Sequence, residues 1–143
     1  MPYQYLDDIA TADAAFKAWG ETLEELFTAA AEATMNVMVA DLATIAPEQQ
    51  RHFSVEADAV DMLLFELLQE IIFYKDAEQL LLRVAELQIS GGDDLWSLTA
   101  TAVGETLNME KHELVVDVKA VTLHRFQVEK TDRGWEALVI LDI

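Results

Sequence analysis

Aspartates stand close to both ends of the sequence. Asp7, Asp8 and Asp13 lie in or beside a predicted turn, and Asp142 adjoins Ile143, whose main-chain carboxylate ends the sequence. If the last strand ran beside the first, these oxygens would converge. Calcium and magnesium bind clusters of carboxylate and carbonyl oxygens, so convergence would create a divalent-metal site. A solvated acidic turn and a solvated acidic chain end are the alternative, which the residues alone favour.

Lys119 is the second candidate for a chemical role. It is one of only nine lysine and arginine residues, and it stands beside Val121 in a segment with the alternation of a strand. Its side chain can extend along apolar neighbours and keep the ammonium in water. It can also balance a carboxylate pocket or reach an acidic or phosphate group of a partner. The residues alone favour the structural role.

Other reactive groups are sparse. The sequence contains no cysteine, which excludes disulfides and a thiolate zinc site. A nucleophilic enzyme would need an activated serine, threonine or lysine, and no serine stands in a recognisable nucleophile motif. His52, His112 and His124 lack the spacing of a metal-binding helix. We expect the first two on the surface or in a sheet, and His124 hydrogen-bonded in a sheet. These observations disfavour a stand-alone metal-dependent hydrolase.

Composition narrows the class of protein. The 143 residues favour one domain spanning 1–143, and 52% hydrophobic residues suffice for a core. The formal net charge of −18 repels phosphate backbones. It suits cation capture or a basic partner protein, although it can also serve solubility alone. No basic segment followed by an apolar run opens the sequence, and no apolar stretch is long enough for a membrane span. We therefore expect a cytoplasmic protein without a membrane partner.

Hydrophobic periodicity predicts an α+β fold. A capping box at Thr22 and Glu25 should begin the first helix, and Asp58 should cap the second, whose apolar stripe is wide enough to pack on a sheet. We expect a mostly antiparallel, or mixed, sheet with two amphipathic helices packed on it. The predicted strands are 3–7, 14–19, 51–57, 80–89, 95–103, 115–129 and 135–143, and the predicted helices are 23–39 and 59–73.

Several motifs, in a fixed order, resemble those of the archeases. The stretch Tyr5–Leu26 is similar to the opening of that family, with Thr11-Ala12-Asp13 and Ala18-Trp19-Gly20 among the matching positions. Later blocks also match, and together they cover nearly the whole chain: Leu63–Glu70, Tyr74-Lys75-Asp76, Gly104-Glu105, His112-Glu113-Leu114, Val118–Thr122, His124, Trp135 and Val139–Ile143. Two positions depart from the family pattern. Ala10 stands for its usual histidine and Leu123 for its tyrosine.

The resemblance implies a function and a site. Archeases have a two-layer fold and are protein cofactors, not enzymes. They promote guanylylation and repeated turnover of the GTP-dependent RNA ligase of tRNA splicing, which joins ends bearing a 3′-phosphate. By resemblance, Asp13, Asp142 and the terminal Ile143 are metal ligands, with calcium expected and magnesium or manganese possible alternatives, and Lys119 is needed for activity. The protein would then contact RNA only through the ligase.

The resemblance leaves a second function open, because archeases have also been described as chaperones or modulators of other RNA-modifying enzymes, such as a tRNA methyltransferase. The oligomeric state is not predicted by any of these features.

Overall fold

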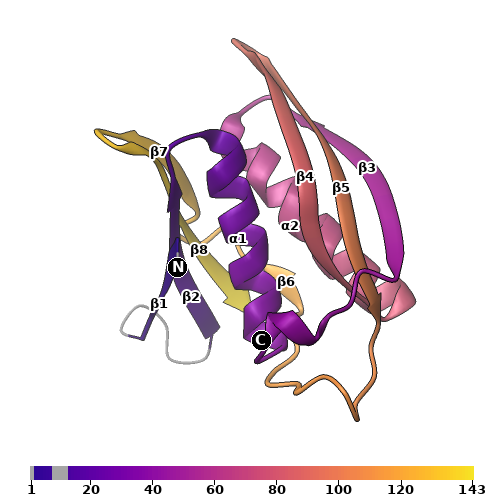
Figure 1. Cartoon of the computed structure of the whole chain (residues 1–143). Coiled ribbons are helices and arrows are strands. Elements are labelled where there is room, and N and C mark those ends of the chain that lie inside the picture. The colour runs from indigo at the N-terminus through magenta and orange to yellow at the C-terminus, as the bar shows by residue number, and fades with distance from the viewer. Residues whose placement is uncertain (1, 8–12) are drawn as a thin grey trace.

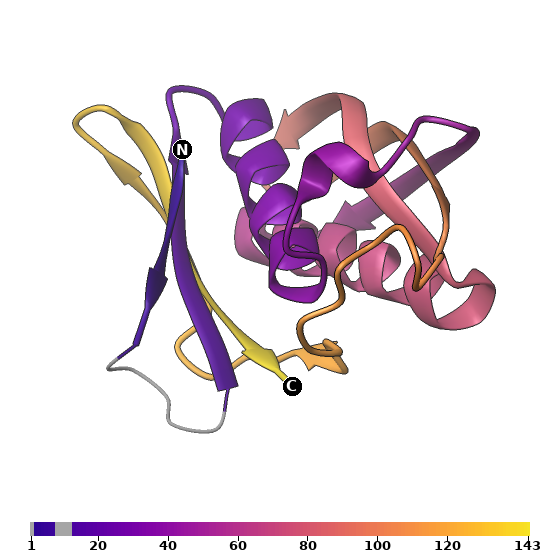
Figure 2. The same cartoon turned by 60° about the horizontal axis from the view of Figure 1, so that its bottom comes forward.

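Two antiparallel sheets enclose a pair of helices. A computed structural model of the chain describes residues 2–7 and 13–143. The helices lie between the two sheets and contact both of them (Figures 1 and 2). In chain order the elements are β1 (Tyr3–Leu6), β2 (Asp13–Gly20), α1 (Leu23–Met38), the 3-10 helix η1 (Leu42–Thr44), β3 (Gln49–Ala57), α2 (Val60–Glu78), β4 (Leu80–Gly92), β5 (Leu95–Thr106), β6 (Ala120–Val121), β7 (Gln127–Thr131) and β8 (Gly134–Asp142).

The larger sheet has the order β1-β2-β8, and β6 and β7 both pair with the remaining edge of β8. The smaller sheet has the order β3-β5-β4. Every strand pairing in the described residues is antiparallel. The predicted α+β class with two helices on antiparallel strands is therefore confirmed, with the strands divided between two sheets. No described helix is long and apolar enough to cross a membrane.

The two helices bury their apolar faces between the sheets. The predicted capping box opens α1: the Thr22 hydroxyl accepts from the Glu25 N–H, and the Glu25 carboxylate accepts from the Thr22 N–H. In α2 the predicted Asp58 cap is wrong, because the N-cap residue is Ala59, which makes no side-chain capping bond. Helix α2 also runs to Glu78, beyond the predicted end at Phe73. Its stripe of fully or nearly buried side chains comprises Leu63, Leu64, Leu67, Leu68, Ile71 and Ile72.

The predicted long strand over 115–129 does not form. Within this segment, only β6 and the first residues of β7 pair with β8, and the five residues of 122–126 lie opposite two, Val139 and Ile140. The excess residues turn out of the sheet, with Arg125 at φ 56° and the Phe126 N–H donating to the Leu123 carbonyl. Alternating polarity fitted a strand, but one edge of β8 could not pair with all of these residues.

A buried charge cluster anchors the segment between β5 and β6. Glu105 is buried, and its Oε2 accepts from the Ala46 N–H at 2.7 Å, from Lys111 Nζ at 2.6 Å and from His112 Nε2 at 3.0 Å. The Asn108 N–H donates to His112 Nδ1 at 3.0 Å. The histidine proton is therefore assigned to Nε2. The expectation of a surface or sheet position for His112 is wrong, because it is buried in this connection.

These bonds lower the pKa of the Glu105 carboxyl to about 2. The Ala46 N–H is the largest cause, followed by Lys111, and burial opposes both. Because the folded-state pKa lies below the ordinary value of 4.5, ionised Glu105 favours the folded state. That contribution is complete above pH 4.5 and is lost as the pH falls from 4.5 to about 2.

We therefore expect Glu105→Gln to lower the melting temperature by several degrees at pH 7. The variant should also lose less stability than the wild type between pH 4.5 and 2, because its amide does not titrate. Circular dichroism melts across this range measure both effects. The control is Glu110→Gln, which removes an exposed carboxylate from the same segment. Equal melting of the two variants at pH 7 would contradict a stabilising role for this cluster.

Candidate functional site: a carboxylate corner at the end of the larger sheet

Strand pairing brings the two candidate aspartates together. Asp13 is the first residue of β2 and Asp142 the last of β8, and the register places them directly opposite each other. Directly opposite residues of an antiparallel pair project from the same face with Cβ atoms about 4.5–5.5 Å apart. Ile143 follows at once. We call the end of these strands, with Asp13, Asp142 and Ile143, the carboxylate corner.

The predicted convergence thus occurs, but with different neighbours. The last strand lies beside the second strand of the chain, and β1 forms the sheet edge beyond it. Asp7 is exposed just after β1, and Asp8 and Ala10 lie outside the described residues. Asp13, Asp142 and Ile143, the predicted metal ligands, therefore lie at one corner of the larger sheet.

Lys119 reaches the same corner from the other side of β8. Its N–H donates to the Asp142 carbonyl at 2.8 Å, and the next residue, Ala120, pairs with Asp142 in β6. The Lys119 side chain is exposed. The Lys119 backbone therefore lies beside Asp142, and its exposed side chain is open to a partner. In contrast, His124 lies exposed in the turn that follows, so its predicted place in the sheet is wrong.

Helix α2 fixes the backbone that carries Lys119. Lys75 Nζ donates to Asp117 Oδ1 at 2.6 Å and to the Val118 carbonyl at 2.8 Å. Its side chain is only 12% exposed. Burial lowers the pKa of Lys75, but the hydrogen-bonded carboxylates of Asp117 and Asp76 outweigh burial and raise it. Sequence analysis singled out Lys75 only within a family motif. Its position in the last turn of a helix was the available signal.

A short apolar surface adjoins the corner. The connection between β5 and β6 lies at the same end of the molecule as the C-terminus in both views (Figures 1 and 2). It exposes large apolar side chains, namely Met109, Leu114, Val115 and Val116. Consecutive exposed aliphatic residues are typical of protein contact surfaces.

The donor chemistry of the corner suits a hard cation. Two aspartates and a main-chain carboxylate offer oxygen only, which favours calcium, magnesium or manganese over softer metals. Within residues 2–7 and 13–143, no group of three or more histidine, cysteine, aspartate or glutamate side chains is arranged to hold a metal. The main chain at Ile143 is the candidate for a third oxygen donor at this corner.

One pair outside the corner has the residue types of a base and a nucleophile. His52 Nδ1 lies 2.9 Å from Thr101 Oγ1 across β3 and β5. The pair is exposed, and no third described side chain hydrogen-bonds His52 to orient it. It lacks the orienting group that activates a hydroxyl nucleophile.

Comparison with known proteins gives the family. The sequence profile of the archease protein family matches residues 3–143. The archease of Thermococcus kodakarensis is 36% identical over 134 residues, which are 93% of this chain and 94% of that protein. The archease of Methanopyrus kandleri is 32% identical over 143 residues, covering both chains completely.

Solved structures agree with these sequences. The solution structure of Methanobacterium thermoautotrophicum protein 1598 superposes with a TM-score of 0.85 at 35% identity, covering 99% of each chain. The crystal structure of a Thermotoga maritima archease, described as a possible chaperone, shares the fold with a TM-score of 0.61 at 18% identity, over 94% of this chain and 93% of that one. From the profile match and these relatives, we conclude that the chain belongs to the archease family.

Proposed function

We propose that this protein is a non-catalytic activator of the GTP-dependent RNA ligase that joins RNA ends bearing a 3′-phosphate or cyclic phosphate. In this proposal it promotes guanylylation of the ligase and repeated turnover. Membership of the archease family supports the class of function. The register that sets Asp13 opposite Asp142, with Lys119 bonded to the Asp142 main chain, is the observation that carries it.

The charges of the molecule favour action through the ligase rather than on RNA. A net charge of −18 repels a polyanion in solution. The exposed aliphatic side chains at 114–116 lie in the segment that leads to Lys119, and they suit a protein contact. Lys119 would then offer its ammonium to an acidic or phosphate group in the ligase active site, while the carboxylates hold a divalent cation.

Asp13, Asp142 and the main-chain carboxylate of Ile143 are the proposed metal ligands, with calcium expected. When bound, the cation would offset the repulsion of three nearby carboxylates and present positive charge at the corner. The chain's own part is to hold the two aspartates opposite each other on paired strands. The backbone of Lys119 is held on the far side of β8 by its bond to Asp142.

A chaperone or modulator of another RNA-modifying enzyme, such as a tRNA methyltransferase, is the second candidate. The exposed aliphatic residues of the β5–β6 connection would serve that role equally well. A pull-down from the native cell separates the two proposals, because the ligase should co-purify under the first and a different RNA-modifying enzyme under the second.

For Lys119 we expect that Lys119→Ala abolishes activation and leaves the fold intact. Its exposed side chain should contribute less than about 1 kcal/mol to stability. The assay uses catalytic amounts of the ligase from the same cell with a 3′-phosphate RNA, GTP and a divalent metal. Lys130→Ala removes an exposed lysine elsewhere and should activate like the wild type. No gain in guanylylation or turnover with the wild-type protein would count against the proposed function. A lower melting temperature with activation retained would instead make Lys119 structural.

For the metal, we expect millimolar calcium or manganese to raise the melting temperature of the wild type. Binding to the folded state alone stabilises a protein by about 2.7 kcal/mol at a ligand concentration 100 times the Kd. Asp13→Asn and Asp142→Asn should each lose most of this rise, because each removes one anionic donor. Asp132→Asn, in the turn between β7 and β8, should retain the full rise.

A chain extended by one glycine past Ile143 tests the main-chain donor, because it converts the carboxylate to an amide without changing a side chain. Retention of the full rise in the extended chain would exclude Ile143 as a ligand. Retention in Asp13→Asn would show that the proposed site is misplaced.

A further inference from the structure

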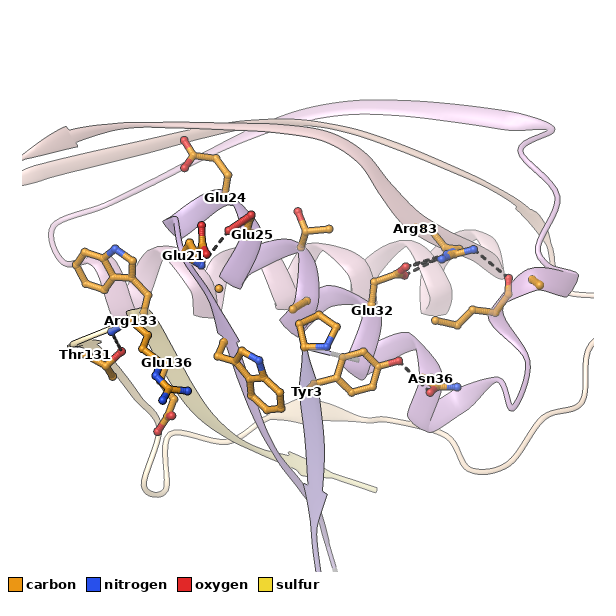
Figure 3. A pocket seen from close by; sticks show the side chains of 18 of the residues that line it. Tyr3, Glu21, Glu24, Glu25, Glu32, Asn36, Arg83, Thr131, Arg133 and Glu136 are labelled. Carbon is orange, nitrogen blue, oxygen red and sulfur yellow. Dashed lines mark hydrogen bonds and ion pairs between the residues drawn. The ribbon is translucent and has the colours of Figure 1, made fainter.

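A broad groove runs along α1, and the end of it beside Gly20 lies far from the carboxylate corner. It has a volume of about 1550 Å³ and is lined from α1, from the ends of β2 and β8, and from η1 and Arg83 (Figure 3). The register places Gly20 opposite Trp135 at this end of the strand pair and Asp13 opposite Asp142 at the other. Seven residues of strand separate the two ends by about 23 Å. The end of the groove with Glu21 and Trp135 is therefore separate from the carboxylate corner.

The groove is strongly acidic. Two arginines, Arg83 and Arg133, oppose a larger set of carboxylates, namely Glu21, Glu24, Glu25, Glu32, Asp41, Asp132 and Glu136. Arg83 is already neutralised, since its Nε donates to both Glu32 oxygens at 3.2 and 3.1 Å. The carboxylates of Glu21 and Asp132 form no ion pair within the described residues. The groove thus retains negative charge that its own arginines do not balance.

Tryptophan rings at the groove add a second feature that selects for cations. Trp19 and Trp135 both line it, and Trp19 is 38% exposed. A cation already lies over one of these rings, because Lys130 Nζ is 5.9 Å from the Trp135 ring centroid. The face of a tryptophan attracts ammonium and, more often, guanidinium groups. An arginine side chain from outside could therefore place its charge among the carboxylates and its plane on Trp19.

We propose that this groove binds an arginine- and lysine-rich segment of a partner protein. A second copy of this chain does not fit, because two molecules of net charge −18 repel each other, and nucleic acid is repelled for the same reason. Between Glu24 and Asn36 the groove follows α1 for about 18 Å, at a rise of 1.5 Å per residue. That length holds an extended segment of about five residues.

The test uses fluorescein-labelled octa-arginine, followed by fluorescence anisotropy at moderate salt. Glu21→Gln combined with Asp132→Asn should weaken binding about fivefold or more, because both charges lie at the groove. Glu110→Gln combined with Asp93→Asn removes two exposed carboxylates elsewhere. This control should change the affinity less than about twofold, because surface charges beyond a Debye length are screened. If both double variants weakened binding equally, attraction by net charge alone would account for the binding, and the proposal would be overturned.

A second readout places the peptide in the groove. The sequence has three tryptophans, and only Trp96 lies outside the groove lining. In a Trp96→Phe background, unlabelled octa-arginine should change the emission of Trp19 and Trp135. Trp19→Phe should reduce that change and weaken octa-arginine more than octa-lysine, because guanidinium stacks on the larger ring. Unchanged emission at saturating peptide would contradict the proposed location even if anisotropy showed binding.

Discussion

The antiparallel pairing of β2 with β8 in one register is the constraint on which the functional site depends. Phe16 and Ala18 of β2 lie opposite Val139 and Ala137 of β8, and all four are buried. A slip of one residue would move one strand's buried side chains to the opposite face. The core packing therefore fixes the register. The same register sets Asp13 opposite Asp142, so the stability of the core holds two like charges together that would otherwise separate.

The segment that carries Lys119 has little regular structure and depends on specific polar bonds. The buried Glu105 and His112 anchor its start, and Lys75 of α2 binds the carbonyl of Val118. On the opposite side, the Lys119 N–H bonds to the Asp142 carbonyl. A backbone held from both sides can present an exposed side chain in a defined place at little entropic cost on binding. In the proposed function, this backbone would hold Lys119 in a defined place for contact with the ligase.

Sequence patterns predicted the elements that are determined by residues close together in the chain. The Thr22 capping box, the apolar stripe of α2 and the strands predicted over 80–89 and 95–103 follow from spacing within one element. Polar and apolar residues do alternate along 115–129, which is why one long strand was predicted. The number of pairing positions that β8 offers to this segment depends on strands distant in sequence, so the prediction was wrong. The burial of His112 likewise depends on its hydrogen bond to the buried carboxylate of Glu105 in β5. The acidic residues at the two ends suggested the carboxylate corner, but only the tertiary structure makes β8 a neighbour of β2 and brings Lys119 to Asp142.

We propose that a divalent cation binds where β2, β8 and the residues before β6 meet. Paramagnetic broadening of backbone amide signals by substoichiometric manganese locates such a cation directly, because the effect falls steeply with distance. We expect selective broadening of the amide signals of Ala14, Ile143 and Ala120, with Glu21 and Asp132 at the acidic groove unaffected. Broadening centred on the groove, or spread evenly over the acidic surface, would contradict the claim.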